Sequence, residues 1–260
     1  MHRTETSPAS QSSTPPTVSP IVGAIPARWA STRLPGKPLR AIAGKPMIEH
    51  VFRRASAAPS LDRVVVLTDD ERIARAVEDF GGDVEMTPAD CASGTDRIAW
   101  AARRWTVGAV VNIQGDEPLI DPQAVDRVAR ALSAGHSMVT LATEAQDEEL
   151  DDPNAVKVVL DRAGDALYFS RSRIPFPRRS EPTPAALKHI GIYGYHLDTL
   201  SRLAALEPTP LERAESLEQL RALEHGISIR VLQVDSAEPG VDTEADLERV
   251  AARLASRDGQ

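Results

Sequence analysis

Short apolar runs alternate with longer amphipathic stretches along most of the chain. Runs at 21–25 (IVGAI), 63–68 (RVVVLT) and 109–113 (AVVNI) are typical of buried β-strands. Pro46 can open a helix between the first two, because the apolar residues after it recur at helical spacing. This alternation indicates βαβ units. It predicts an α/β fold with a doubly wound, mostly parallel sheet up to about residue 150.

Capping signals mark the predicted helices of this first part. Asp69 or Asp70 can cap a helix that stops at the glycine pair 81–82. Residues 93–96 (SGTD) have the spacing of a capping box, and Asp121 with Pro122 is typical of a helix start. Each signal lies where the apolar pattern changes from strand to helix, so pattern and caps predict the same elements.

The middle of the chain follows a different pattern. Segments 155–161 (AVKVVLD) and 166–171 (ALYFSR) flank the turn-like residues 162–165, which predicts an antiparallel hairpin. The remaining predicted elements are a strand at 189–197, a helix at 211–224, a strand at 227–234 and a final helix from Thr243.

The domain organisation follows from composition. Residues 1–18 are rich in Ser, Thr and Pro and lack the apolar run of a secretory signal, so we interpret them as a disordered leader. Residues 19–256 form a single predicted domain, with 153–195 as an inserted hairpin subdomain.

Charge and cysteine content exclude several classes of function. The formal net charge of -8 argues against binding to nucleic acid or to an anionic membrane surface. Cys91 is the only cysteine, which rules out an intrachain disulfide and fits a reducing compartment. We find no apolar stretch of membrane-spanning length. A cytoplasmic protein is therefore the expectation.

A cationic loop follows the first predicted strand. Arg28, Arg33 and Lys37 place three cations within ten residues of an acidic chain, and Ser31 adds a neutral donor. Ligands of open parallel sheets bind beyond the carboxyl ends of the strands, so this loop can meet a triphosphate. It has neither Walker A nor G-x-G-x-x-G spacing. A solvated basic loop is the alternative interpretation.

Two aspartates are candidate metal ligands. Asp116 follows the strand at 109–113 within the sequence QGDEP, and Asp242 lies between a strand-like run and the last helix. Mg²⁺ in proteins prefers one or two carboxylates together with phosphate and water. The alternative for Asp242 is a role at the helix N-terminus, where Thr243 and Asp246 have capping-box spacing.

A series of ordered motifs resembles one enzyme family. They are IPARWASTRLPGKPL, TDD, SGTDR, NIQGDEP, PNAVKVVLD, ALYFSR, IPF, KHIGIYGY, LEQLR and PGVDTEADLERV. In this order they resemble the 3-deoxy-manno-octulosonate (Kdo) cytidylyltransferases, also called CMP-Kdo synthetases, over roughly residues 20–252. The resemblance implies a nucleotide-diphospho-sugar transferase-like fold and a homodimer that uses CTP and Mg²⁺ to form CMP-Kdo and pyrophosphate.

The resemblance also implies roles for individual residues. The implied nucleotide-binding residues are Arg28, Ser31, Arg33, Lys37, Ser93 and Arg97. Asp116 and Asp242 are implied metal ligands, which act in catalysis together with Lys37 and Arg28. The implied sugar-acid pocket comprises Gln114, Arg171, His189, Tyr193, Glu218 and Gln219. From residue type alone, the histidine, the tyrosine and the helix residues among them could equally be structural.

Two departures from the family pattern concern the acceptor. The stretch 177–187 is shorter than in many members of the family, and Phe176 stands where Trp is common. Both flank the sugar-side motifs, so 8-amino-Kdo or a nonulosonate stays open as an alternative acceptor. A catalytically silent nucleotide-binding homologue is a further alternative. The apolar hairpin at 155–169 is where we expect the dimer interface.

Overall fold

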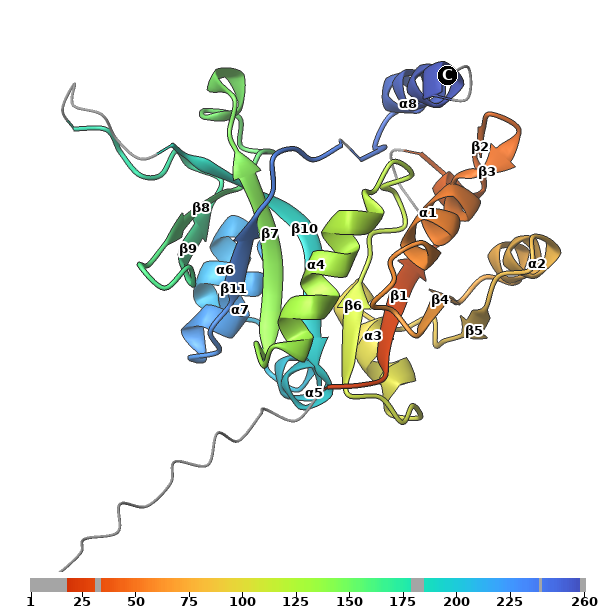
Figure 1. Ribbon diagram of the computed structural model, residues 1–260, viewed down its shortest axis with the longest axis horizontal. Helices are drawn as coiled ribbons and strands as arrows, with labels where there is room; N and C mark the ends of the chain where they lie inside the picture. Colours follow the sequence, from red (N-terminus) through yellow and green to blue (C-terminus); the bar gives the residue numbers. More distant parts are fainter. Residues whose placement is uncertain (1–17, 31–33, 179–184, 239, 258–260) are drawn as a thin grey trace, which may run out of the picture.

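The computed structural model describes residues 18–30, 34–178, 185–238 and 240–257 (Figure 1). Over these ranges the chain forms a nine-stranded mixed sheet flanked by helices. Seven strands follow the order β11-β7-β10-β6-β1-β4-β5, while β8 pairs with β10 and β9 pairs with β8. The predicted α/β fold with a mostly parallel sheet is confirmed.

Four neighbouring strands form the parallel half of the sheet. They are β6 (Ala109–Asn112), β1 (Ile21–Ala27), β4 (Arg63–Thr68) and β5 (Val84–Met86). All three pairings among them are parallel. Because their residues are buried on both faces, the first three strands carry the continuous apolar runs seen in the sequence. The short, half-buried β5 lacks such a run and was not predicted.

Helices cover both faces of the sheet, as a doubly wound fold requires. One core cluster packs against helices α1 (Met47–Ser56), α2 (Glu71–Asp79) and α4 (Pro122–Ser133). The other packs against α3 (Gly94–Ala102), α5 (Leu197–Ala204) and α7 (Gln219–Glu224). The predicted caps by Asp70, Ser93 and Asp121 are present at α2, α3 and α4. Helix α5 was not predicted.

The second half of the sheet is built around an antiparallel strand. Strand β10 (Leu187–His196) runs between β6 and β7 (Met138–Glu144) and is antiparallel to both, while β11 (Arg230–Gln233) is parallel to β7. The predicted hairpin is confirmed: β8 (Lys157–Leu160) and β9 (Ala166–Ser170) pair antiparallel. In Figure 1 this hairpin lies at the opposite end of the molecule from α2 and β5.

The prediction of a single helix at 211–224 is wrong. The chain forms two short helices there, α6 (Pro210–Glu215) and α7, separated at Ser216, which adopts a left-handed conformation with φ 52°. The carboxylate of Glu215 accepts hydrogen bonds from Ser170 Oγ and from the backbone N–H of Arg171. These contacts come from about 45 residues away, and no Gly or Pro marks the break, so local sequence gave no sign of it.

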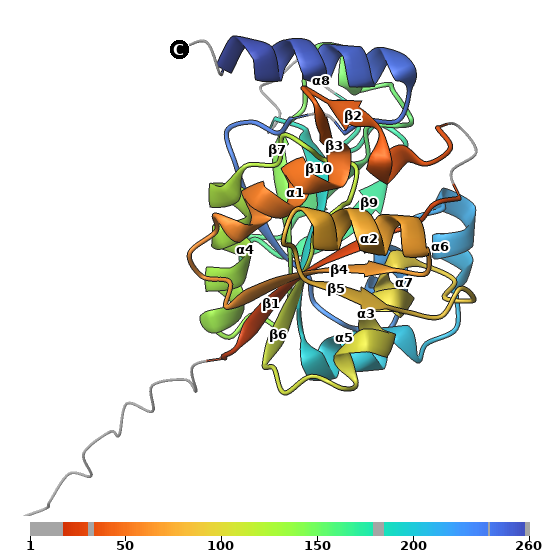
Figure 2. The ribbon, with the colours of Figure 1, turned by 90° about the vertical axis from the view of Figure 1, so that its right-hand side faces the viewer.

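The last helix returns to the start of the chain. Helix α8 (Glu244–Arg257) lies across a small hairpin of β2 (Ala41–Ile42) and β3 (Lys45–Pro46), as Figure 2 shows. A third core cluster joins the two ends of the chain, formed by Leu34, Ile42, Met47, Leu119, Val241, Leu247, Val250 and Leu254. This packing brings the segment around Asp242 to the loop that follows β1.

Two further features bear on the predictions. Within the described ranges, no helix combines the length and the apolar character needed to cross a bilayer. Of the predicted leader, residues 1–17 lie outside the described residues.

Candidate active site

Three segments meet at the carboxyl end of the parallel strands. They are the loop after β1, the loop after β6 and the segment preceding α8. Lys37 Nζ joins them, since it donates to Asp116 Oδ2 at 2.6 Å, to Asp242 Oδ1 at 3.1 Å and to the Val241 carbonyl at 2.6 Å. Both predicted metal ligands therefore contact the same ammonium group, although 126 residues separate them in the chain.

Aromatic packing positions Lys37. It begins the 3₁₀-helix η1 (Lys37–Leu39), which follows Gly36 in a left-handed conformation with φ 66°. A Cβ at Gly36 would lie 2.9 Å from the Trp29 ring, so only glycine fits against the indole. Arg72, which belongs to α2, stacks on the same indole, with its guanidinium carbon 3.3 Å from the ring centroid. This stack fixes the loop relative to the sheet.

Helix α8 positions Asp242 without using its carboxylate as the cap. Asp246 Oδ2 accepts from the backbone N–H groups of Asp242 and Thr243, and Thr243 Oγ1 accepts from the Asp246 N–H. Burial disfavours ionisation of Asp246, but these hydrogen bonds and one from Arg249 outweigh it and lower its pKa to about 2. The capping box is present, and the Asp242 carboxylate faces Lys37 instead.

The predicted nucleotide-side residues fall into four groups, of which the last is Arg97. Arg28 lines a cavity of about 230 Å³ together with Lys37, Gln114 and Asp116, and its Nη2 donates to the Cys91 carbonyl at 2.7 Å. Ser93 belongs to the capping box of α3 and accepts from the N–H of Asp96. Ser31 and Arg33 lie outside the described residues.

Arg97 lies in the interior of the protein. It is 0% exposed, donates to the Thr87 hydroxyl, and its Nη2 lies 3.3 Å from Asp69 Oδ1. The structure therefore places this predicted nucleotide-binding side chain between α3 and the end of β4, away from the cavity beside Lys37. Its sequence position in SGTDR gave no sign of burial, because arginine is usually exposed.

A second cavity of about 270 Å³ adjoins the first and shares Gly94 and Gln114 with it. Five of the six predicted sugar-acid residues line it, namely Gln114, His189, Tyr193, Glu218 and Gln219. They come from the loop after β6, from β10 and from the start of α7. These elements are far apart in the sequence, and the antiparallel insertion of β10 beside β6 brings them together.

A β-bulge in β10 shapes this second cavity. The pairing with β7 shifts register between Ile190 and Tyr193, and the Gly191 carbonyl accepts from Gln114 Nε2 at 3.0 Å. Thr140 Oγ1 supports the bulge, lying 2.8 Å from the Ile192 carbonyl oxygen and 2.9 Å from His189 Nε2.

The two ionisable rings of this cavity are neutral at physiological pH. Burial lowers the pKa of His189 to about 3, and burial together with the neighbouring Tyr195 and Glu218 raises the pKa of Tyr193 well above 10. The His189 ring packs against Phe169 and Tyr193, with centroids 5.1 and 5.3 Å away. These side chains can act as hydrogen-bonding groups without carrying charge.

Arg171, the sixth predicted sugar-acid residue, is engaged elsewhere. Its guanidinium donates to the carbonyl oxygens of Glu215 at 2.6 Å, Pro153 at 2.8 Å and Ser216 at 3.3 Å. It thereby fastens the end of β9 to the turn between α6 and α7, and it lines neither of the two cavities described above. Arginine satisfied by three carbonyl groups acts here as a structural clamp.

Two polar residues of the second cavity escaped the sequence analysis. Thr95 donates from its hydroxyl to Glu218 and so orients that carboxylate. Asn112 closes β6 with a side chain that is only 4% exposed. A polar residue at the end of an otherwise apolar strand was the available signal for Asn112, while Thr95 was hidden within the capping-box motif.

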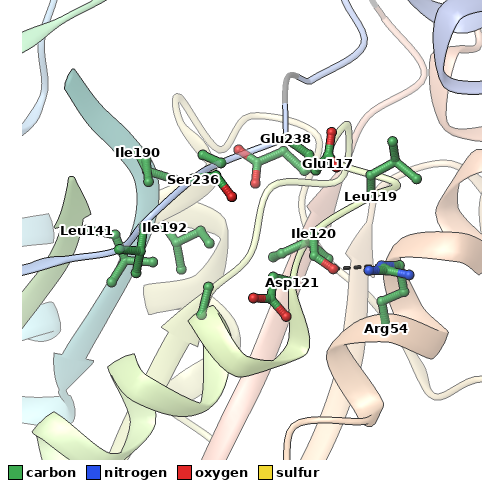
Figure 3. Close-up of a pocket in the computed structure, with 13 residues that line it drawn as sticks. Arg54, Glu117, Leu119, Ile120, Asp121, Leu141, Ile190, Ile192, Ser236 and Glu238 are labelled. Carbon is green, nitrogen blue, oxygen red and sulfur yellow. Dashed lines mark hydrogen bonds between the residues drawn. The ribbon is translucent and has the colours of Figure 1, made fainter. Parts of the chain in front are cut away.

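A third cavity is lined by Glu117 and by residues of the loop that follows it (Figure 3). It measures about 350 Å³ and is lined by Glu117, Ile190 and Ser236 among others, and Arg54 Nε donates to the Ile120 carbonyl at its edge at 2.6 Å. Burial, reinforced by the adjacent Asp116, raises the pKa of Glu117 to about 8. The neighbouring carboxylates of Asp116 and Glu117 thus face different surroundings.

The donor set at Lys37 suits a metal ion that keeps other ligands. Among the described residues, no group of three or more His, Cys, Asp or Glu is placed to hold a metal ion. The carboxylates of Asp116 and Asp242 do converge on one cation, the Lys37 ammonium group. Two protein carboxylates completed by phosphate oxygens and water are the usual environment of Mg²⁺, so these residues fit it.

Comparisons with known proteins show which family the chain resembles. A family model described as cytidylyltransferase matches residues 22–229. The 3-deoxy-manno-octulosonate cytidylyltransferase of Syntrophotalea carbinolica is 51% identical over 245 residues, covering 90% of this chain and 98% of the relative. The corresponding protein of Myxococcus xanthus is 51% identical over 240 residues, covering 92% and 98%.

A solved structure is similar over nearly the whole chain. It is described as CMP:2-keto-3-deoxy-manno-octonic acid synthetase complexed with CTP, and it superposes with a TM-score of 0.89 at 45% identity, covering 92% of this chain and 100% of its own. Sequence, family model and three-dimensional likeness agree with the motifs that carried the resemblance. The chain belongs to the family of the 3-deoxy-manno-octulosonate cytidylyltransferases.

Proposed function

We propose that this chain is a cytidylyltransferase that joins CTP and Kdo to form CMP-Kdo and pyrophosphate. The single observation that carries the proposal is the convergence of Asp116 and Asp242 on Lys37, at the first of two adjoining cavities. One cavity is lined by the cations Arg28 and Lys37 and suits a triphosphate. The other is lined mainly by uncharged polar side chains together with the carboxylate of Glu218, and it suits the hydroxyl groups of a sugar acid.

The transfer is an in-line displacement at phosphorus. The anomeric hydroxyl oxygen of Kdo forms a bond to the α-phosphorus of CTP, the bond from that phosphorus to the bridging oxygen of the β-phosphate breaks, and the hydroxyl proton is released. Lys37 and Arg28 neutralise the departing pyrophosphate, which carries the electron pair away. Gln114, which lines both cavities, lies where the two substrates would meet.

Asp116 and Asp242 would hold Mg²⁺. The bound ion would act as a Lewis acid that lowers the pKa of the attacking hydroxyl and offsets charge on the phosphate. The two carboxylates are held ready for a cation by the hydrogen bonds around α8 and by the loop after β6. Lys37 contacts both carboxylates and is long enough to turn toward a phosphate oxygen.

We further propose a cytoplasmic homodimer. The β8–β9 hairpin supports this, since Leu167 on β9 is 61% exposed and Phe176 beyond its end is 81% exposed. Exposed apolar side chains that gather on one surface are typical of protein–protein contacts, which makes this hairpin the candidate interface. Light scattering of the purified protein measures its mass in solution, and a monomer at micromolar concentration would rule the dimer out.

A pyrophosphate-release assay tests the reaction. Purified protein with CTP, Mg²⁺ and Kdo should release pyrophosphate, whereas ATP, GTP or UTP in place of CTP should give little. The same assay with 8-amino-Kdo and a nonulosonate identifies the preferred acceptor. Binding of CTP without turnover on any of these acids would contradict the proposed function and would support a silent nucleotide-binding homologue.

A further inference from the structure

The buried side chain of Asn112 carries an oxygen that has no hydrogen-bond partner among the described residues. Asn112 ends β6 and is 4% exposed, yet its Oδ1 accepts no hydrogen bond from any residue that the structure describes. A buried amide left unpaired is unfavourable, so natural proteins almost always pair such groups or reserve them for a ligand or water. The Asn112 side chain lies in the wall of the second cavity, where a ligand can reach it.

Tyr193 presents the same feature directly opposite. It pairs with Asn112 in the register of β10 and β6, and its hydroxyl also lacks a hydrogen-bond partner within the described part of the chain. Two other polar side chains of this cavity have partners. Glu218 accepts from Thr95, and Gln114 donates to Gly191. Among the described residues that line this cavity, Asn112 and Tyr193 are thus the two with a fully buried polar atom left unpaired.

The chemistry of this pair defines what it can bind. A carboxamide offers one acceptor and one donor group, and a tyrosine hydroxyl can do either. Neither carries charge, because burial keeps Tyr193 protonated. Uncharged groups able both to donate and to accept suit a hydroxyl of a sugar, whereas a carboxylate or phosphate would be met by cations. The pair therefore fits the polyol part of an acceptor.

We propose that Asn112 is a specificity-determining residue, which hydrogen-bonds a hydroxyl group of the acceptor sugar acid beside Tyr193. This inference rests on the proposed function and assigns one contact within it. A site built to hydrogen-bond a hydroxyl rejects analogues that lack it, because the buried groups are then left unpaired again. Asn112 thereby selects polyhydroxylated acids over deoxygenated ones.

The substitution Asn112→Leu tests the assignment, because leucine has a similar volume but no polar atoms. We expect the KM for Kdo to rise about tenfold, the effect of one neutral hydrogen bond, while the KM for CTP changes less than twofold. The melting temperature without ligand should stay the same or rise, since an unpaired buried amide is removed. Asn154→Leu, at the other asparagine of the chain, changes an exposed side chain and serves as the matched control.

The outcomes separate the inference from the proposed function. An unchanged KM for Kdo in folded Asn112→Leu protein, with active wild type, would overturn the role of Asn112. If the leucine variant does not fold, Asn112→Ser provides the same comparison of the two KM values, and equal changes in both would overturn it as well. Wild-type protein that releases no pyrophosphate from CTP and Kdo would overturn the proposed function itself.

Discussion

Replacing Lys37 by methionine should have opposite effects on metal binding and on catalysis. The Lys37 ammonium lies 2.6 Å from Asp116 Oδ2 and 3.1 Å from Asp242 Oδ1, in the position where a divalent cation would bind. A cation that enters must displace it. In Lys37→Met the two carboxylates keep their positions but lose their internal counter-ion, so Mg²⁺ should bind more tightly to the variant than to the wild type in the absence of nucleotide.

The size of the effect follows from the geometry. With an effective dielectric constant of about 20, Coulomb's law gives roughly 5 to 6 kcal/mol for each of these two contacts before desolvation. The side chains of Asp116 and Asp242 are 35% and 49% exposed, and for exposed ion pairs solvent reduces the net value to about 1 kcal/mol. Relief of this competition corresponds to a gain of about tenfold in the affinity for Mg²⁺.

Catalysis should change in the other direction. Lys37→Met removes a cation from the site of the departing pyrophosphate, so kcat/KM should fall by about a hundredfold or more. Calorimetric titration with Mg²⁺, and with Mn²⁺ followed by electron paramagnetic resonance, measures the affinity. Lys45→Met, an exposed lysine on β3, is the control and should leave both quantities unchanged. A variant at Lys37 that binds the metal equally well or less well would refute the competition.

Three further predictions concern neighbouring carboxylates and one arginine. Asp116→Asn should lower kcat by several orders of magnitude with little change in the melting temperature, and near-normal turnover would refute its role as a metal ligand. Glu117→Gln tests the pKa of Glu117, which is about 8 in the folded protein and near 4.5 in the unfolded chain. As the pH rises from 4.5 to 8, the unfolded state ionises first, so the unfolding free energy of the wild type falls by a few kcal/mol and the variant escapes this loss. Urea denaturation at pH 5 and pH 8 measures the unfolding free energy of both proteins. If the wild type and the variant differ in unfolding free energy by the same amount at both pH values, the raised pKa of Glu117 is contradicted. Arg171→Ala should lower the unfolding free energy by about 2 kcal/mol through the lost carbonyl contacts. A raised KM for Kdo with an unchanged melting temperature would instead assign Arg171 to the sugar pocket.

Local sequence was sufficient for the elements that local forces determine. The apolar runs of β1, β4 and β6 are buried on both faces, and the caps at Asp70, Ser93 and Asp121 are where their side chains predicted them. The loop after β1 could also be placed, because ligand loops follow the carboxyl ends of parallel strands.

Features set by distant contacts could not be predicted from the same patterns. The break at Ser216 depends on Glu215 meeting β9, and the bulge at Gly191 depends on Thr140 of a neighbouring strand. Arg97 and Arg171 are of the residue type that usually reaches solvent, and only the fold reveals that carbonyl, hydroxyl or carboxylate groups enclose them. Sequence pattern indicates which residues carry chemistry, whereas tertiary contacts decide where each side chain points.

The assembly of the site depends on how the two ends of the chain are held together. Asp116 is fixed by the strand that precedes it, but Asp242 reaches Lys37 only because α8 packs on the β2–β3 hairpin through a small core cluster of its own. That cluster is separate from the two clusters that pack against the sheet. An ion pair between Arg40, just before β2, and Glu244, at the start of α8, connects the same two segments. The same carboxylates that bind Lys37 would bind the metal ion. The ammonium therefore links the segment before the last helix to the nucleotide loop, and it keeps the two aspartates together at the point where a divalent cation would need both.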